Sequence, residues 1–392
     1  MAEFTVRFAG AGLETPPPLA LYIHLPWCVR KCPYCDFNSH AALHIPEAAY
    51  IDALLADLEH ALPDIWGRRI HSVFFGGGTP SLFSPDGIDR ILVAVRTLTG
   101  LVPGAEITLE ANPGTIEAAK FAGFREAGVT RLSLGVQSFD SRQLKALGRI
   151  HGAAESYRAA ELAAAHFETF NLDLMYALPG QSVAGALADV EAALTFEPPH
   201  VSAYHLMLEP NTPFGHAAPA GLPGEDAAAD MQSAIDARLR EAGLAHYEIS
   251  AYAKPGQAAR HNLNYWHFGD YLGIGAGAHS KLSFSDRIVR QMRVKHPQQY
   301  MEAVRAGGHV VEARVLGRDD LPFEFMMNAL RLVDGVPTSL FEARTGLPIG
   351  TCAGALSQAR ERGLLELGAL QLRPTRLGQH FLNDLLTLFL PD

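Results

Sequence analysis

The sequence predicts an α/β fold: a TIM-like parallel barrel, complete or incomplete, followed by a mostly helical C-terminal domain. From residue 19 to about residue 210, short apolar runs alternate with Ala- and Leu-rich segments of helical period, which is typical of parallel βαβ units. Five consecutive runs also end in loops with unusual Cys, Gly, Asn or Gln residues. In a barrel, the loops at the carboxyl ends of the strands surround one site, whereas an open doubly wound sheet binds ligands only at its switch point. The barrel therefore fits these loops better.

The expected strands are apolar at most positions, as in strands that are covered on both faces. They span residues 21–25, 72–75, 107–110, 131–134, 171–175 and 201–206. The expected helices between them span residues 47–62, 85–98, 116–127, 153–167 and 183–196. A helix over 225–242, a strand over 247–252 and a Gly-rich segment over 272–279 follow. Toward the C-terminus, helices precede an expected hairpin over 364–372, an order that resembles a winged-helix fold.

These patterns divide the chain into four parts. Three consecutive prolines, Pro16 to Pro18, end an N-terminal tail over residues 1–18, because proline stiffens the chain and stops regular structure. The barrel covers residues 19–224 and a barrel extension covers residues 225–296. The C-terminal helical domain covers residues 297–392.

Composition excludes several classes of protein. Of the 392 residues, 48% are apolar and 19% are charged, as in globular proteins. A net charge of −10 argues against nucleic acid as a partner, because binding its backbone needs concentrated Lys and Arg. No apolar run reaches the roughly 20 residues of a membrane span, and residues 1–12 lack the apolar core of a secretory signal. We therefore expect a cytoplasmic protein.

Three of the four cysteines form a cluster after the first expected strand. Cys28, Cys32 and Cys35 lie in one loop, where Pro26 and Pro33 prevent a helix. A [4Fe–4S] cluster normally takes four thiolates, so three thiolates leave one iron with open coordination. Such an iron can bind the amino and carboxylate groups of a methionine, as in S-adenosylmethionine (SAM). The spacing therefore predicts a metal site made by these three cysteines.

Two other interpretations of the cysteines remain open. A structural zinc site would need a fourth ligand, which His24 or His40 could supply. Alternatively, the cysteines are buried and inert. The glycine-rich loops at neighbouring strand ends favour the cluster, because a structural zinc would not need them. The fourth cysteine, Cys352, lies in an Ala-rich helical segment and is expected in the core.

Together these motifs resemble the radical SAM superfamily and, more narrowly, the oxygen-independent coproporphyrinogen dehydrogenase family. The resemblance runs from about residue 19 to near the C-terminus. It implies an incomplete barrel of six (β/α) units, a [4Fe–4S] cluster and SAM. The matching segments are Tyr22–Cys28, Cys32–His40, Phe74–Pro80, Thr108–Gly114, Leu134–Phe139 and Asn171–Gly180.

Several residues at the strand ends are candidates for holding SAM. Gly77 and Gly78 lack side chains, so their backbone can approach a ligand, with Thr79 nearby. A plain tight turn is the alternative for these glycines, and solvent-facing side chains are the alternative for the polar residues. The resemblance implies that Tyr34 packs against the adenine. It also implies contacts with SAM from Tyr22, Glu110, Gln137, Arg149 and Asp173.

One position departs from the coproporphyrinogen dehydrogenase pattern. Members of that family that decarboxylate propionates carry a further cysteine two residues after the third one, where this chain has Phe37. A phenyl ring does not replace a thiol, so this position argues against that enzymatic activity. The segment Cys35–His40 instead resembles the HemW-type heme chaperones, which bind heme and pass it to other proteins.

A second motif, in the barrel extension, agrees with the heme chaperones. Residues 261–266 have the form His-Asn-x-x-Tyr-Trp, which the resemblance associates with heme binding. His261 could be an axial ligand of heme iron, and Tyr265 and Trp266 could pack on the porphyrin. Alternatively, His261 caps a loop while the two aromatic rings seal a domain junction. His279 is a weaker candidate for the same cleft.

The sequence thus predicts a heme chaperone that binds a [4Fe–4S] cluster, SAM and heme. Its expected partners are heme and heme-acceptor proteins, with respiratory proteins and peripheral membrane association as further expectations. One alternative is an oxygen-independent coproporphyrinogen III dehydrogenase, which decarboxylates propionates by radical chemistry. The other alternative is a zinc-stabilised binding protein.

Overall fold

A computed structural model describes residues 13–391, apart from the side chains of residues 115 and 116. Most of the predicted N-terminal tail, residues 1–18, therefore lies outside the described residues. The described end of that segment is not detached from the fold. Leu13 packs against the core of the C-terminal helices, and the Pro18 carbonyl accepts a hydrogen bond from the Asp270 N–H at 2.9 Å.

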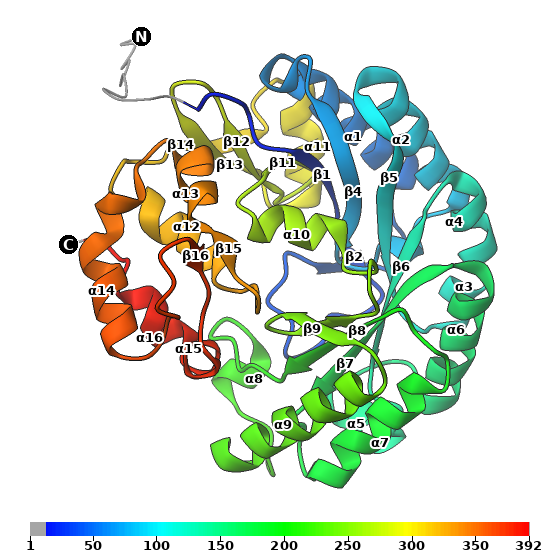
Figure 1. The fold of residues 1–392 in the computed structure, drawn as a ribbon. Coiled ribbons are helices and arrows are strands. Elements are labelled where there is room, and N and C mark those ends of the chain that lie inside the picture. The colour runs from blue at the N-terminus through cyan, green and yellow to red at the C-terminus, as the bar shows by residue number, and fades with distance from the viewer. Residues whose placement is uncertain (1–12, 392) are drawn as a thin grey trace.

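The described residues form one twelve-stranded sheet, with a central parallel part that curves into a partial barrel (Figure 1). Six parallel strands follow one another in chain order, and each is followed by helices, which confirms the predicted incomplete (β/α)6 barrel. They are β1 (Leu19–Leu25), β4 (Arg69–Gly77), β5 (Gly100–Ala111), β6 (Arg131–Gln137), β7 (Thr169–Tyr176) and β8 (His200–His205).

Further strands extend both edges of this parallel part, so the sheet stays open. On one edge, β11 (Asp270–Ile274) lies parallel to β1, and β12 (His279–Ser283), β13 (Ile288–Arg293) and β14 (Val310–Val315) follow as antiparallel strands. On the other edge, β10 (Ala251–Ala253) and β9 (Ala245–Glu248) follow β8. Helix α10 (Arg260–Trp266) lies inside the curve of the sheet (Figure 1).

Helices cover the outer face of the barrel, where they bury apolar strand residues such as Ile23, Phe75 and Leu109. Local sequence fixes their starts. For example, α2 begins at Pro85, and the Ser84 hydroxyl caps it by accepting the Gly87 N–H at 3.0 Å. The covering helices are α1 (Glu47–Ala61), α2 (Pro85–Leu98), α3 (Thr115–Ala118), α4 (Phe121–Ala127), α5 (Ser141–Ala146), α6 (Ala153–His166), α7 (Val183–Leu194), α9 (Glu225–Glu241) and α11 (Pro297–Arg305).

The strand residues on the inner face differ from the prediction of mostly apolar strands. Successive side chains of a strand point to opposite faces, and the inward positions of the parallel strands are largely polar. On β5 these positions are Glu106, Thr108 and Glu110, and on β7 they are Asn171 and Asp173. The barrel therefore has an apolar outer face and a polar interior.

Three predicted elements also differ in detail. The helix expected over 116–127 is broken into α3 and α4, where Lys120 donates from Nζ to the carbonyls of residues 81–83 at 2.8–3.1 Å. The strand expected over 247–252 is the hairpin β9–β10, whose turn is fixed because Ser250 N–H and Oγ both bond Glu248. The C-terminal hairpin forms with a shifted register: Leu365 pairs with Pro374, and the Glu366 N–H bonds the Arg373 carbonyl at 3.0 Å. Its second arm, β16 (Gln371–Leu372), also pairs with β15 (Val336–Pro337).

The C-terminal helices form a second core beside the barrel, around Phe325, Phe341 and Leu385. These helices are α12 (Leu321–Ala329), α13 (Thr338–Thr345), α14 (Ala353–Glu361), α15 (Arg376–His380) and α16 (Leu382–Thr387). Cys352 is buried in this core, as predicted. The predicted domain boundaries stay predictions, although β14, which falls after residue 297, pairs with β13 in the barrel sheet.

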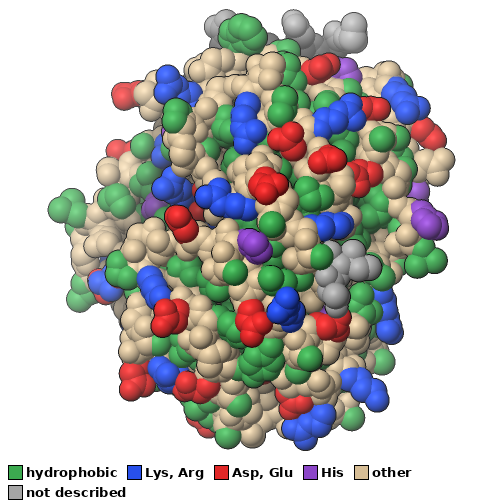
Figure 2. Space-filling model, turned by 90° about the vertical axis from the view of Figure 1, so that its right-hand side faces the viewer, with side chains coloured by type: hydrophobic (Ala, Val, Ile, Leu, Met, Phe, Trp, Pro, Cys, Tyr) green, Lys and Arg blue, Asp and Glu red, His purple; other side chains and the backbone are tan. Residues whose placement is uncertain are grey.

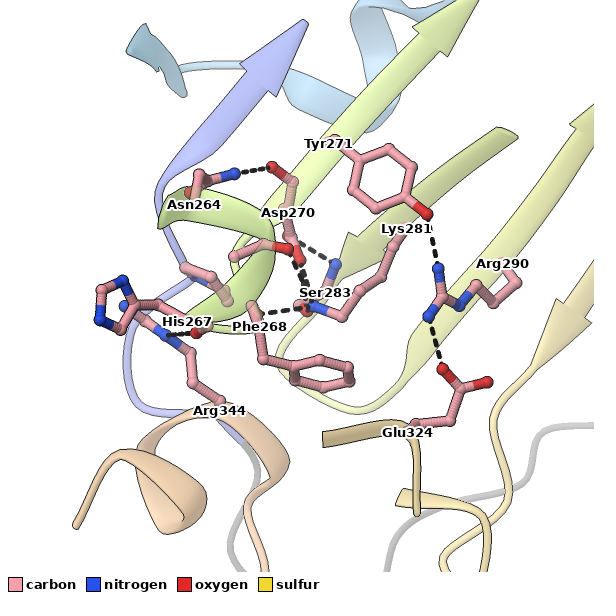
Figure 3. A network of polar contacts seen from close by, with 12 residues as sticks. Asn264, His267, Phe268, Asp270, Tyr271, Lys281, Ser283, Arg290, Glu324 and Arg344 are labelled. Atoms are coloured by element: carbon pink, nitrogen blue, oxygen red, sulfur yellow. Dashed lines mark hydrogen bonds and ion pairs between the residues drawn. The ribbon is translucent and has the colours of Figure 1, made fainter. Parts of the chain in front are cut away.

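Polar contacts fix α10 and β11 to the C-terminal helices (Figure 3). Arg344 on α13 donates to the His267 carbonyl at 3.3 Å, just after α10. Arg290 on β13 bridges the Tyr271 hydroxyl at 2.6 Å and the Glu324 carboxylate of α12 at 2.5 Å. These bonds make the C-terminal helices part of the support for α10.

The outer surface carries mixed charge on the side formed by α2, α3, α4 and α6, where basic and acidic side chains are interspersed (Figure 2). This mixture gives that side no extended field of one sign. Within the described part of the chain, no helix has the length and apolar character needed to cross a membrane.

Candidate functional site

The carboxyl ends of the parallel strands enclose a cavity of about 330 Å³, which we call the inner cavity. Its walls are inward-pointing strand side chains and the loops that follow the strands. His261 lines it, and so do all but one of the residues predicted to hold the cluster or SAM: Cys28, Cys32, Tyr34, Cys35, Gly77, Gly78, Thr79, Glu110, Gln137, Arg149 and Asp173. The exception is Tyr22, which lines a second cavity.

The cysteine loop is closed at its base by a short pair of strands, β2 (Trp27–Cys28) and β3 (His40–Ala41). Within the loop, the Cys35 N–H bonds the Cys32 carbonyl at 3.1 Å. None of the three cysteines is in a disulfide, and each is partly exposed. The loop thus presents three free thiols to one cavity.

Two polar side chains donate to the sulfur atoms. The Thr79 hydroxyl lies 3.4 Å from Cys28 Sγ, and Arg149 Nη1 lies 3.5 Å from Cys32 Sγ. Burial raises the pKa of the Cys28 and Cys35 thiols, so the free thiols hold their protons more tightly than usual. Metal ligands must be deprotonated, and donors aimed at sulfur stabilise that charged form.

The residues proposed for a zinc site are not arranged around one point within residues 13–391. Among the described residues, no three His, Cys, Asp or Glu side chains converge where one metal ion could bind. In an iron–sulfur cluster each thiolate binds its own iron, so the sulfurs need not meet at one point. His24, one proposed zinc ligand, has both ring nitrogens in hydrogen bonds, to Tyr22 Oη at 2.9 Å and to the Asn38 carbonyl at 2.8 Å.

Asn112 connects the two donors and was missed by the sequence prediction. Its Nδ2 donates to Thr79 Oγ1 at 2.8 Å, and its Oδ1 accepts from Arg149 Nη2 at 2.5 Å. Arg149 also donates to the Gly135 carbonyl at 2.9 Å, so its side chain points into the cavity and not into solvent. The Asn112-Pro113-Gly114 sequence at a strand end was the available signal.

The two predicted glycines are needed to pack the cysteine loop. A Cβ on Gly78 would lie 2.5 Å from the Trp27 carbonyl oxygen, and a Cβ on Gly77 would lie 2.5 Å from the His24 ring. Gly77 also has a φ of 112°, which disfavours other residues. The N–H groups of Gly78 and Thr79 are engaged within the protein, because they bond the carbonyls of Leu25 and Trp27.

The carboxyl groups of Glu110 and Asp173 lie near enough to each other inside the barrel for their charges to interact. Burial first, and the charge of Asp173 second, raise the pKa of Glu110 to about 8. Glu110 accepts the Gly77 N–H at 3.2 Å. Burial also raises the pKa of Asp173, although its oxygens accept from Asn171 at 2.7 Å and Ser133 at 3.2 Å. Cationic or donor groups of a ligand would therefore be favoured at this wall.

The floor of the inner cavity is a polar network that the sequence prediction missed. Asn171 Oδ1 lies 2.6 Å from His200 Nδ1 and accepts from Ser202 Oγ at 3.0 Å. His200 Nε2 in turn lies 2.9 Å from the Tyr247 hydroxyl. Alternation of polar and apolar residues along β7 and β8 was the signal that could have revealed it.

His261 is buried at the side of the inner cavity, where α10 meets the barrel. Its Nδ1 lies 2.7 Å from Glu106 Oε1, and its ring stacks on Phe74 with 4.4 Å between centroids. Burial would raise the pKa of Glu106, but the hydrogen bond and charge of His261 and the charge of Arg131 outweigh it and lower this pKa to about 2. A carboxylate on one ring nitrogen is the usual support of a metal-binding histidine.

A second cavity of about 810 Å³, which we call the outer cavity, adjoins the inner one. The side chains of Tyr265 and Trp266 line it, whereas His261 of the same motif lines only the inner cavity. The outer cavity is also lined by Tyr22 and His279. The two cavities share Phe37, Ser39, Phe74, Gly77 and Glu110.

The chain is similar to known proteins over nearly its whole length. Residues 22–192 match the radical SAM superfamily, and residues 316–381 match the HemN C-terminal domain. The chain is 48% identical to heme chaperone HemW of Escherichia coli over 379 residues, which covers 96% of this chain and 99% of that protein. It is 46% identical to heme chaperone HemW of Haemophilus influenzae, with coverage of 96% and 99%.

One solved structure supports the fold. Coproporphyrinogen III oxidase (HemN) from Escherichia coli, described as a radical SAM enzyme, matches with a TM-score of 0.80 at 23% identity. The match covers 95% of this chain and 90% of that chain. It supports the partial barrel with a mostly helical C-terminal domain, and at this identity it bears on the fold alone.

Proposed function

This chain belongs to the family of the HemW heme chaperones within the radical SAM superfamily, and on this premise we propose that it binds heme and delivers it to acceptor proteins. Membership of the superfamily implies a [4Fe–4S] cluster and SAM as cofactors. The relatives named heme chaperones supply the class of function.

The residues of the inner cavity fit both cofactors. Three free thiols share the cavity, and Thr79 and Arg149 direct donors at two of the sulfurs. A cluster with one open iron would supply one-electron chemistry and bind the amino acid part of SAM. Glu110 and Asp173 would accept from the ammonium group or ribose hydroxyls of SAM, and Gln137 offers both a donor and an acceptor.

The placement of helix α10 is the observation that carries the proposal. Its His-Asn-x-x-Tyr-Trp motif lies between the two cavities, with His261 on the inner one and Tyr265 and Trp266 on the outer one. The polar ring and the aromatic rings of the motif are thus presented to cavities beside the cysteine loop. The two aromatic rings support a ligand with a large flat apolar surface in the outer cavity, and His261 fixes the start of the helix that carries them through its contact with Glu106.

The position of Phe37 supports heme binding over the enzymatic alternative. Its side chain is 60% exposed and lies on the wall that the two cavities share. An exposed phenyl ring at this place provides an apolar contact surface and no thiol. A coproporphyrinogen III dehydrogenase would be expected to carry a further cysteine there.

Heme titration of the anaerobically reconstituted protein tests the proposal. We expect a saturable Soret band, and transfer of the bound heme to an apo-globin that serves as a general acceptor. His261→Ala tests the sequence prediction that this residue binds the iron, with His216→Ala, an exposed histidine of α8 (Pro213–His216), as control. A protein that gives no Soret change at saturating heme would contradict the proposed function.

An activity assay tests the alternative. The reconstituted protein, a reductant, SAM and coproporphyrinogen III should give no protoporphyrinogen, and its formation would make the chain a dehydrogenase. The respiratory acceptors, a cytoplasmic location and peripheral membrane association remain proposals that rest on the sequence resemblance.

A further inference from the structure

We infer that the outer cavity is the heme site, with His279 as the imidazole that reaches the iron and with Lys31 and Lys295 beside the propionates. This inference rests on the proposed function and specifies where the cargo binds. It differs from the sequence prediction for His261, which becomes a positioning residue of α10.

The volume and walls of the outer cavity suit a porphyrin. At about 810 Å³ it has more than twice the volume of the inner cavity, which the cluster loop and all the SAM candidates except Tyr22 already line. Large ligands need such a volume and mostly apolar walls. Six aromatic side chains line the outer cavity: Tyr22, Phe37, Phe74, Tyr265, Trp266 and Tyr271.

These walls are fixed from outside the cavity. The Tyr271 ring contacts Tyr265 edge to face at 5.1 Å, and its hydroxyl is held by Arg290 (Figure 3). Arg331 of the C-terminal part stacks over the Trp266 ring at 4.3 Å. Aromatic walls held in this way are preorganised for a flat ligand, which reduces the entropy cost of binding.

His279 is the histidine of this cavity with an exposed and unengaged ring. Three histidines line the cavity, and both ring nitrogens of His24 are already hydrogen-bonded. The Nε2 of His40 is buried. Within residues 13–391, the His279 ring has no hydrogen-bond partner and its side chain is exposed. Burial first, then the charges of Lys295 and Arg290, lower its pKa, so the neutral form that binds iron is favoured.

The charges around the cavity suit carboxylates at one edge of the ligand. Lys31 and Lys295 both line the cavity and are exposed. The acidic residues that line it are Asp36, which is exposed at the surface, and Glu110 at the shared inner wall. The Lys31 ammonium group, which donates to the Phe37 carbonyl at 2.8 Å in the ligand-free structure, and the exposed Lys295 ammonium group can therefore pair with the two propionates while the ring stays among the aromatic residues.

In this arrangement His261 supports the site without touching the iron. Its bonds to Glu106 and its stacking on Phe74 fix the start of α10, and the end of that helix carries Tyr265 and Trp266. Loss of His261 would loosen the aromatic wall, and the iron would keep its ligand. The Soret position therefore separates a positioning residue from a ligand.

The first experiment compares histidine variants by heme titration and Soret position. His279→Ala should bind heme about tenfold more weakly, with a shifted Soret band that added imidazole restores. His261→Ala should keep the wild-type Soret position, and His296→Ala, an exposed neighbour that does not line the cavity, should match wild type. The inference is overturned if His279→Ala keeps the wild-type Soret position while His261→Ala loses it.

The second experiment asks whether heme and SAM bind together. Saturating SAM should change the heme affinity by less than about twofold, because separate cavities are occupied, whereas a loss of about tenfold or more would place heme in the inner cavity. Wild type should also bind heme about tenfold better than its dimethyl ester, and the Lys31→Ala/Lys295→Ala variant should lose this preference. Equal binding of ester and heme by wild type would contradict the role of the lysines.

These outcomes also separate the two claims. Absence of any heme binding by wild type would refute the proposed function together with this inference. Heme binding that depends on His261 for its Soret position and competes with SAM would refute this inference alone.

Discussion

Replacing Glu110 with glutamine should change how the stability of the ligand-free protein depends on pH. The Glu110 side chain faces the inner cavity, and protein atoms surround it on its other sides. Burial and the nearby charge of Asp173 raise its pKa to about 8 from a usual value of 4.5. An unfolded chain restores the usual value, so the two states hold different numbers of protons between these pH values.

The sign of the effect follows from which state holds the proton. Between about pH 4.5 and 8, the folded chain keeps a proton on Glu110 that the unfolded chain has released, so raising the pH favours unfolding. One proton corresponds to about 1.4 kcal/mol per pH unit. Glutamine does not titrate. As the pH rises from about 5.5 to 7.5, the free energy of unfolding of the variant should therefore increase by about 1 to 3 kcal/mol relative to that of wild type. The lower end of this range allows for screening by water in the cavity.

Urea unfolding of cluster-free protein, followed by circular dichroism at several pH values, measures this difference. Glu126→Gln, at an exposed position of α4, serves as a matched control. Its free energy of unfolding should depend on pH in the same way as that of wild type. A difference between Glu110→Gln and wild type that stays constant across this pH range would refute the reasoning.

The remaining predictions concern the cofactors and the loop that holds them. SAM carries positive charge, so its binding should favour ionised Glu110. The affinity for SAM, measured by calorimetry, should therefore rise by up to about tenfold per pH unit below pH 8. An affinity that does not change with pH would show that SAM does not bind beside Glu110. Gly78→Ala should lower the free energy of unfolding in urea by about 1 to 3 kcal/mol and reduce the bound iron, because its Cβ would clash with Trp27. The control Gly354→Ala, whose Cβ would lie in open space on α14, should change neither property. Unchanged stability of Gly78→Ala would contradict that packing. Arg149→Ala removes a donor to Cys32 and should release iron to a chelator about tenfold faster; equal release rates would show that this donor is unimportant.

The barrel and its loops could be predicted because local sequence encodes them. Short apolar runs, helical periods and Gly- or Pro-rich loops repeat in order, and the strand ends of such a repeat meet at one edge of the sheet. The polar interior was harder to recognise. Glu106, Thr108 and Glu110 alternate with apolar residues, but each expected strand was short enough to read as apolar on both faces.

Contacts between segments that are far apart in the chain could not be predicted from the sequence. Glu106 and His261 are separated by 155 positions, and no spacing pattern links them. The separation of the motif on α10 between two cavities is likewise a consequence of how the helix sits in the barrel. Residue types could therefore suggest a heme motif, whereas the cavity that each residue faces depended on the tertiary fold.

The most direct test of this account is the electron paramagnetic resonance spectrum of the reduced, anaerobically reconstituted protein with and without SAM. We expect about four iron and four sulfide per chain and a cluster signal that changes when SAM is added. The Cys32→Ala variant should lose the iron and sulfide and also the cluster signal. Protein that contains zinc without iron, or a cluster signal that SAM leaves unchanged, would contradict a three-cysteine cluster with an open iron.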